Sequence, residues 1–144
     1  MQRMSVQEYR KRQGKSKSKY GNKKVEIGGH VFDSRAEARY YQHLKLLERA
    51  GEILFFRLQP RYLLLESFKK HGKTHRRIDY IADFEVHHKD GSIEVVDVKG
   101  VATDVFRMKE KMFHVKYPHK LSVIKHDPAH GWIELDKPKK LKRR

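Results

Sequence analysis

Residues 94–100 read Glu94-Val95-Val96-Asp97-Val98-Lys99-Gly100, an apolar run that carries an acid and an amine near its end. Successive side chains of a β-strand point to opposite faces, so Asp97 and Lys99 share one face while Val96 and Val98 share the other. The run therefore predicts a strand that holds a carboxylate and an ammonium group side by side.

The segments on either side of this strand predict a mixed sheet. Upstream, residues 76–87 form a second predicted strand, which a turn at Lys89-Asp90-Gly91 joins antiparallel to residues 92–99. Downstream, Thr103 can cap a helix over residues 104–116, Pro118 stops that helix, and residues 121–124 return as a strand. A passage of this length from strand through helix to strand suits a parallel crossover.

The first half of the chain adds a hairpin, a helix and two strands. The pair Gly28-Gly29 predicts a hairpin over residues 24–32, and Ser34 can cap a helix that ends near Gly51. Residues 53–58 are a predicted strand, residues 62–65 are apolar enough to lie inside the sheet, and residues 69–75 are a predicted basic loop. The expected fold class is therefore α/β, a mixed β-sheet flanked by helices.

Length and charge predict one folded domain that binds a polyanion. The chain has 144 residues, and 34 Lys and Arg against 18 Asp and Glu give a net charge of +16. We assign residues 1–23 to a flexible basic arm, residues 24–136 to the folded domain and residues 137–144 to a basic tail. The charge indicates nucleic acid as the partner, and no apolar run is long enough to span a membrane.

The chain contains no cysteine, which excludes disulfides, thiol catalysis and thiolate zinc sites. The ten histidines show no shared spacing that favours zinc. We expect a cytoplasmic protein, because a reducing compartment fits this composition.

Asp83 is a second candidate acid for the site on the 94–100 strand. It lies between Ala82 and Phe84, where a buried carboxylate is costly unless it is paired or binds a metal. A strand end, a turn and a return strand would bring Asp83 beside Asp97. Two such acids suit a hard divalent cation next to a phosphodiester, and Lys99 could orient the attacking water or offset charge on the phosphate. The residues thus predict a phosphodiester-cleaving site.

This arrangement resembles the PD-(D/E)xK nuclease superfamily, in which an acid on one strand precedes an acid-any-lysine motif on the next. Here the first element reads Ala82-Asp83 in place of Pro-Asp, and the second reads Asp97-Val98-Lys99. Residues 32–38 resemble the glutamate-bearing helix that precedes the sheet in many members. Two further segments, Gln59-Pro60 and residues 100–103, are similar to small phage-encoded endonucleases related to Holliday-junction resolvases.

The resemblance covers roughly residues 25–125 and implies a restriction-endonuclease-like fold. It implies that Glu37, Asp83 and Asp97 are ligands of Mg²⁺ or Mn²⁺, that Lys99 is catalytic and that Gln59 is an accessory residue. The implied activity is that of a Mg²⁺-dependent endodeoxyribonuclease that cuts branched DNA, such as Holliday junctions, during DNA recombination. We expect a homodimer, because a symmetrical junction needs two coordinated cuts. A phage-encoded protein of this kind would act in the cytoplasm of the bacterial host.

The basic residues outside the arms are predicted DNA contacts, which would give affinity without reading sequence. They are Lys69, Lys70, Lys73, Arg76, Arg77, Arg107 and Lys109. For Arg107 and Lys109 a solvated helix face explains the charge equally well.

Simpler explanations stay open for several of these residues. Glu37 completes a capping-box pattern that starts at Ser34, and Gln59 could be a polar turn residue before proline. Asp97 and Lys99 could form an exposed ion pair, which contributes little to stability. The chain could also be a non-catalytic basic nucleic-acid-binding protein, or a nicking or restriction-type nuclease on the same fold.

Overall fold

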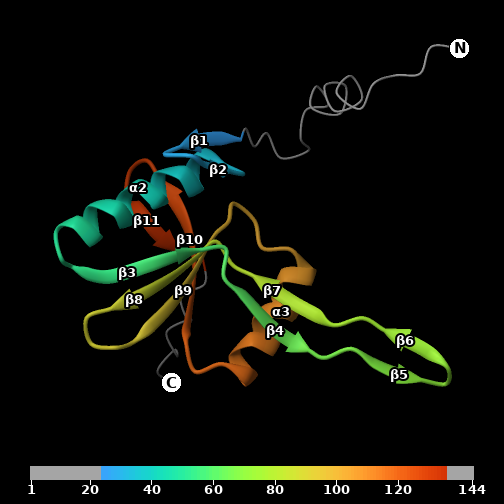
Figure 1. Ribbon diagram of the computed structural model, residues 1–144. Coiled ribbons are helices and arrows are strands. Elements are labelled where there is room, and N and C mark those ends of the chain that lie inside the picture. The colour runs from blue at the N-terminus through green and yellow to red at the C-terminus, as the bar shows by residue number, and fades with distance from the viewer. Residues whose placement is uncertain (1–23, 136–144) are drawn as a thin grey trace, which may run out of the picture. The chain divides into compact units, whose positions relative to one another are not determined.

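The computed structural model describes residues 24–135, so the predicted basic arms at residues 1–23 and 137–144 lie outside the described residues. The chain divides into two compact units, residues 1–39 and residues 40–144. The described residues form a mixed α/β protein with a mostly β core and two helices (Figure 1). No helix within residues 24–135 is long and apolar enough to cross a membrane.

The first unit contains the predicted hairpin and the capped start of a helix. Strands β1 (Val25–Ile27) and β2 (His30–Phe32) pair antiparallel around Gly28 and Gly29. Both glycines have positive φ, 58° and 83°, which suits a two-residue hairpin turn. The helix α2 (Arg35–Arg49) begins after Ser34, whose Oγ accepts a hydrogen bond of 3.1 Å from the Glu37 amide. The hairpin and the helix cap are therefore confirmed.

The second unit is built on a five-stranded sheet in the order β11-β10-β9-β8-β3. Its strands are β3 (Ile53–Leu58), β8 (Phe84–His88), β9 (Ile93–Val98), β10 (Lys120–Asp127) and β11 (Gly131–Glu134). Strands β9 and β10 are parallel, and the other neighbours are antiparallel. The connection from β9 to β10 contains α3 (Asp104–Lys116), which begins at the predicted cap Thr103. The predicted parallel crossover is confirmed, whereas β11 was not predicted.

The two faces of this sheet bury different sets of side chains. Val95 of β9 and Val123 of β10 belong to a core cluster that also contains Phe106 and Phe113 of α3. The opposite face carries Phe84 of β8, which packs edge-to-face against Tyr40 of α2. Because side chains alternate along a strand, Asp97 and Val95 face the α3 side.

Two sequence predictions about this region were wrong. Residues 62–65 do not lie inside the sheet, because β4 (Arg61–Leu65) pairs with β7 (Ile78–Ile81) in a separate two-stranded ribbon. Tyr62 and Leu64 are buried in the α3 cluster while Leu65 is 42 % exposed, so one covered face explains the apolar sequence. Residues 76–87 do not form one strand either, since β7 ends at Ile81 and β8 begins at Phe84.

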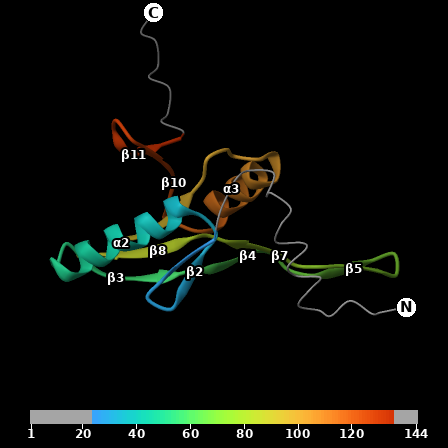
Figure 2. The same cartoon turned by 90° about the horizontal axis from the view of Figure 1, so that it is seen from above.

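The predicted loop at residues 69–75 is a second hairpin. Strands β5 (Phe68–Lys70) and β6 (Lys73–His75) pair around a turn at His71 and Gly72, which have φ of 50° and 74°. The turn was not predicted, because His71-Gly72 lacks the Asn-Gly or Asp-Gly pair that most strongly indicates a two-residue hairpin turn. The hairpin extends the β4–β7 ribbon away from the five-stranded sheet (Figures 1 and 2).

Candidate functional site

Asp97 lies at the end of β9 and is only 4 % exposed. Its Oδ2 accepts a hydrogen bond of 2.5 Å from the Tyr80 hydroxyl, and its Oδ1 lies 3.6 Å from the Lys99 Nζ. Burial raises the pKa of Tyr80, and the charge of Asp97 raises it further, so the hydroxyl remains a proton donor. Because the carboxylate is buried, the exposed ion pair considered for Asp97 and Lys99 is not what the structure shows.

Lys99 is held from two sides at the mouth of this site. Its Nζ lies 4.5 Å from the centre of the Phe106 ring, in addition to its contact with Asp97. Its backbone amide donates to the Ile124 carbonyl at 2.9 Å, which continues the pairing between β9 and β10 past Val98. The side chain keeps 28 % of its surface exposed, so the ammonium group is positioned and still accessible.

Asp83 lies in the link between β7 and β8, not on a strand as predicted. Its Oδ2 accepts a hydrogen bond of 2.7 Å from the Val98 amide, which belongs to the peptide group that follows Asp97. The Asp83 carboxylate therefore accepts the hydrogen bond of a β9 amide that lies beyond the residues paired with β8. The charge of Asp83 also raises the pKa of Tyr80, so both aspartates act on the same hydroxyl.

Tyr80 and Glu110 complete the surroundings of this site, and neither was predicted from the sequence. Glu110 lies on α3 one turn after Phe106, and its negative charge also raises the pKa of Tyr80. Its carboxylate forms an ion pair of 3.2 Å with Arg107. The spacing of Phe106 and Glu110 on one helix face was the available signal, but it required knowing that α3 covers the end of β9.

The two aspartates of the site could hold a metal ion only together with ligands from outside the protein. Within residues 24–135, no three His, Asp or Glu side chains are close enough together to hold a metal ion by themselves. Mg²⁺ is commonly bound by one or two carboxylates and completes its coordination with water and substrate phosphates. Asp83 and Asp97 are the residues that could act as such ligands, because each carboxylate oxygen can accept more than one contact. We call Asp83, Asp97 and Lys99, together with Tyr80, the aspartate site.

The metal-binding role of Glu37 and the accessory role of Gln59 stay predictions. Glu37 lies in the first unit, where its amide donates to the Ser34 cap. Gln59 has an exposed side chain and a φ of 48°, and its amide donates to the Asp83 carbonyl at 2.9 Å. The backbone of Gln59 thus supports the segment that carries Asp83.

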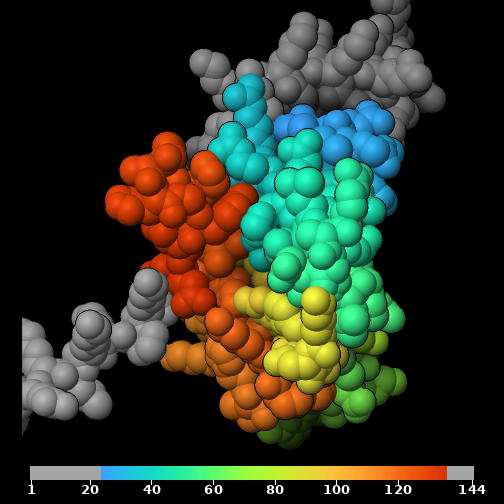
Figure 3. Space-filling view, turned by 90° about the vertical axis from the view of Figure 1, so that its left-hand side faces the viewer, coloured from blue at the N-terminus to red at the C-terminus, as the bar shows by residue number. Residues whose placement is uncertain are grey.

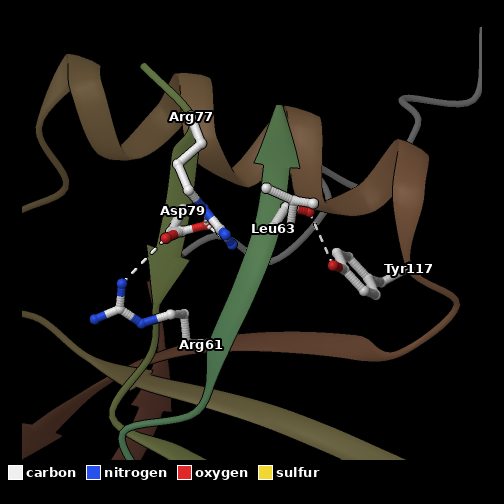
Figure 4. A network of polar contacts seen from close by, with 5 residues as sticks. All are labelled: Arg61, Leu63, Arg77, Asp79 and Tyr117. Carbon is white, nitrogen blue, oxygen red and sulfur yellow. Dashed lines mark hydrogen bonds and ion pairs between the residues drawn. The ribbon is translucent and has the colours of Figure 1, made fainter. Parts of the chain in front are cut away.

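Two arginines that were predicted to contact DNA, Arg77 and Arg107, form ion pairs within the protein. Asp79 lies between Arg77 and Arg61, with contacts of 2.8 Å and 3.1 Å (Figure 4). The hydrogen bonds from Arg77 are the main reason that the pKa of Asp79 lies below its ordinary value. Asp79 therefore links Arg61 of β4 with Arg77 next to β7, and Arg107 is similarly paired with Glu110.

The remaining predicted DNA contacts on the hairpin are exposed. Lys69, Lys70, Lys73 and Arg76 have no carboxylate partner within the described part of the chain. Lys109 on α3 is partly buried. Tyr117, the residue that follows the last turn of α3, ties this helix to β4, because its hydroxyl donates to the Leu63 carbonyl at 2.8 Å (Figure 4).

A separate cleft of about 690 Å³ lies at the start of β9, at the other end of that strand from Asp97. It is lined by the β8–β9 turn and by Pro118, His119 and Lys120. In Figure 3 the yellow segment around the β8–β9 turn lies against the orange segment of α3 and the residues after it. The partly buried acid of the cleft, Glu94, bonds His88 through one oxygen and accepts from the Ser122 hydroxyl through the other. The second acid of the cleft, Asp90, is exposed and accepts hydrogen bonds from Ser92. Because neighbouring His and Ser residues engage both acids, and neither acid has a lysine two residues later in the sequence as Asp97 does, the aspartate site is the stronger candidate.

We expect Tyr80→Phe to lower the free energy of unfolding by about 1.5–3 kcal/mol, because it leaves a buried carboxylate without its hydrogen-bond donor. Urea denaturation at neutral pH measures this loss. Tyr117→Phe is the matched control, since it removes a hydroxyl that donates to a neutral carbonyl, and it should cost about 0.5–1.5 kcal/mol. Equal losses in the two variants would show that Asp97 does not depend on Tyr80.

A search of the curated proteins finds no match to this chain. One family model does match, over residues 17–129, and its description is "Protein of unknown function (DUF1064)". The match includes Glu37, Asp83, Asp97 and Lys99, as well as the β5–β6 hairpin and α3. Because it covers well over half of the 144 residues, the chain belongs to the DUF1064 family of proteins of unknown function.

Proposed function

We propose that the protein is a Mg²⁺-dependent DNA endonuclease with a restriction-endonuclease-like fold of the PD-(D/E)xK type. One observation carries this proposal: Asp83 bonds the peptide that follows Asp97, and Lys99 lies beside Asp97 at the same strand end. Asp83, which lies outside the strand that carries Asp97 and Lys99, thereby contacts the end of that strand. Their order along the chain is the order of the motif that the sequence resembles.

The chain's own residues have distinct tasks in this proposal. Asp83 and Asp97 would hold the cation, which when bound polarises a phosphate and lowers the pKa of a coordinated water. Tyr80 fixes the orientation of Asp97 through its hydrogen bond. Lys99, held over the Phe106 ring, orients the attacking water or offsets the negative charge that builds on the phosphate.

The distribution of charge supports a catalytic site over a surface that only binds nucleic acid. In a chain of net charge +16, the charges of Asp83, Asp97 and Glu110 all act on one tyrosine hydroxyl. Negative charges around a site would weaken phosphate binding there, unless a cation is bound between them and the phosphate. The alternative, a non-catalytic basic nucleic-acid-binding protein, explains the net charge but leaves the grouping of Asp83, Asp97 and Lys99 as a coincidence.

The DNA substrate is proposed from two lines of support. The net charge favours a polyanion, and the resemblance to resolvase-related endonucleases favours branched DNA such as a Holliday junction. Two coordinated cuts in such a junction would be made by a homodimer. A nicking or restriction-type enzyme on the same fold would instead cut linear duplexes.

Incubation of the purified protein with labelled junction, flap and linear DNAs tests this function. Each DNA is incubated with Mg²⁺, with Mn²⁺ or with chelator. We expect cleavage that requires the metal and is faster on the junction than on a linear duplex of the same sequence. Absence of cleavage on every DNA would overturn the proposal, and preference for linear duplex would assign the restriction-type alternative.

A further inference from the structure

The β5–β6 hairpin and its flanking residues, 66–77, form the outer end of the ribbon that leaves the sheet at Asp83 (Figures 1 and 2). We call these residues the distal ribbon. Every residue from Leu65 to Thr74 is exposed, and β5 and β6 pair only with each other. A segment with no buried side chain adds nothing to the hydrophobic core. We therefore expect this projecting hairpin to contact a binding partner.

The two faces of the distal ribbon differ in chemistry. On one face, Phe68 pairs across the strands with His75, and Lys70 pairs with Lys73. The Phe68 and His75 rings stack at 4.7 Å with an angle of 11° between their planes, and this stack stiffens the base of the hairpin. Lys69 and Thr74 point to the opposite face.

The Lys70–Lys73 pair is unfavourable within the protein alone. Like charges that face each other directly across two strands destabilise a hairpin. Of the five Lys and Arg residues in the distal ribbon, only Arg77 has a carboxylate partner among the described residues. An external anion would relieve this repulsion, and it would have to reach both lysines at once.

The dimensions of the hairpin suit a DNA groove. Two strands lie about 4.8 Å apart, and the major groove of B-DNA, about 12 Å wide, admits a two-stranded ribbon. Pairing with the edge of a second protein strand is disfavoured, because lysines along an edge strand oppose such addition. Duplex DNA is therefore the partner that both the charge and the shape of the segment fit.

We propose that the distal ribbon inserts into a groove of duplex DNA, with Lys70 and Lys73 on its phosphates, and so anchors the substrate beside the aspartate site. This inference rests on the proposed function for the choice of DNA as ligand. The ribbon leaves the sheet at the β7–β8 link that contains Asp83, so a duplex gripped by the ribbon is tethered to the strand end that carries the site. The contacts are to the backbone and confer affinity without sequence preference.

The test compares two double variants that each remove two lysines. Lys70→Ala with Lys73→Ala changes the ribbon, and Lys89→Ala with Lys125→Ala removes the same charge from exposed positions on other elements. Fluorescence anisotropy with a labelled duplex arm, in chelator and over a range of salt concentrations, measures binding without cleavage. Thermal unfolding checks that both variants stay folded, as expected for exposed side chains.

We expect the ribbon variant to bind about 10-fold or more weakly at low salt, and its log–log salt slope to fall by roughly 2 because two phosphate contacts are lost. The control variant should keep the wild-type slope. Equal affinity and slope in the two variants would overturn the ribbon proposal, as would absence of DNA binding by the wild type. Binding that depends on the ribbon, without cleavage in Mg²⁺, would instead overturn the proposed endonuclease and leave the ribbon proposal intact.

Discussion

Asp97→Asn is expected to lower Mg²⁺-dependent DNA cleavage about 1,000-fold or more, because loss of one member of a catalytic set is nearly as damaging as loss of the set. Asparagine keeps the shape of aspartate and can still accept the hydrogen bond from Tyr80. It removes the negative charge that would hold the cation. Single-turnover cleavage of a labelled junction measures the effect.

DNA binding distinguishes a lost catalytic group from a lost fold. We expect Asp97→Asn to bind DNA in chelator at least as tightly as the wild type, since a negative charge has been removed. Asp79→Asn is the matched control, because Asp79 is also ion-paired but lies on the ribbon between Arg61 and Arg77. That variant should cleave within a few-fold of the wild type, and a large loss there would mean that ion-pair removal alone is damaging.

Lys99→Met is expected to lower cleavage about 100-fold to 1,000-fold, in the range of removing one preorganised group that stabilises transition-state charge. Methionine keeps an apolar stem that can pack on Phe106 and removes only the ammonium group. The measurement is the rate of cleavage at saturating protein, so that weaker binding cannot imitate the effect.

Lys89→Met provides the comparison for Lys99. Lys89 is exposed in the β8–β9 turn, and its replacement removes the same charge away from the aspartate site. Its cleavage rate should stay close to that of the wild type. If Lys99→Met cleaves as fast as Lys89→Met, then Lys99 serves only as a partner for Asp97.

Much of the secondary structure could be predicted from local signals. Thr103 and Ser34 cap the helices as expected, and the β9–α3–β10 crossover follows from its strand-helix-strand order. The errors arose where tertiary context overrides the local pattern. The apolar residues 62–65 are buried by α3 and not by a second layer of sheet, and a long β run is divided at Ala82-Asp83 because its halves pair with different strands.

The candidate site was partly accessible from the sequence. Alternation along one strand is enough to predict Asp97 beside Lys99, and the Asp97 Oδ1 and the Lys99 Nζ lie 3.6 Å apart. The sequence could not reveal Tyr80 as the donor to Asp97, or Glu110 as a nearby charge, because those contacts depend on how β7 and α3 pack. Asp83 was singled out correctly as a neighbour of the 94–100 strand, but its contact is to the Val98 amide from a link between strands.

The most direct test of the central claim is one paired cleavage assay. Wild type, Asp97→Asn and Asp79→Asn are purified side by side and incubated with a labelled four-way junction in Mg²⁺ or in chelator. Identical purification guards against a contaminating nuclease, because any contaminant would be present in all three preparations. The proposal predicts cleavage by the wild type and Asp79→Asn in Mg²⁺ only, and essentially none by Asp97→Asn. Equal cleavage by all three proteins, or none by the wild type, would contradict it.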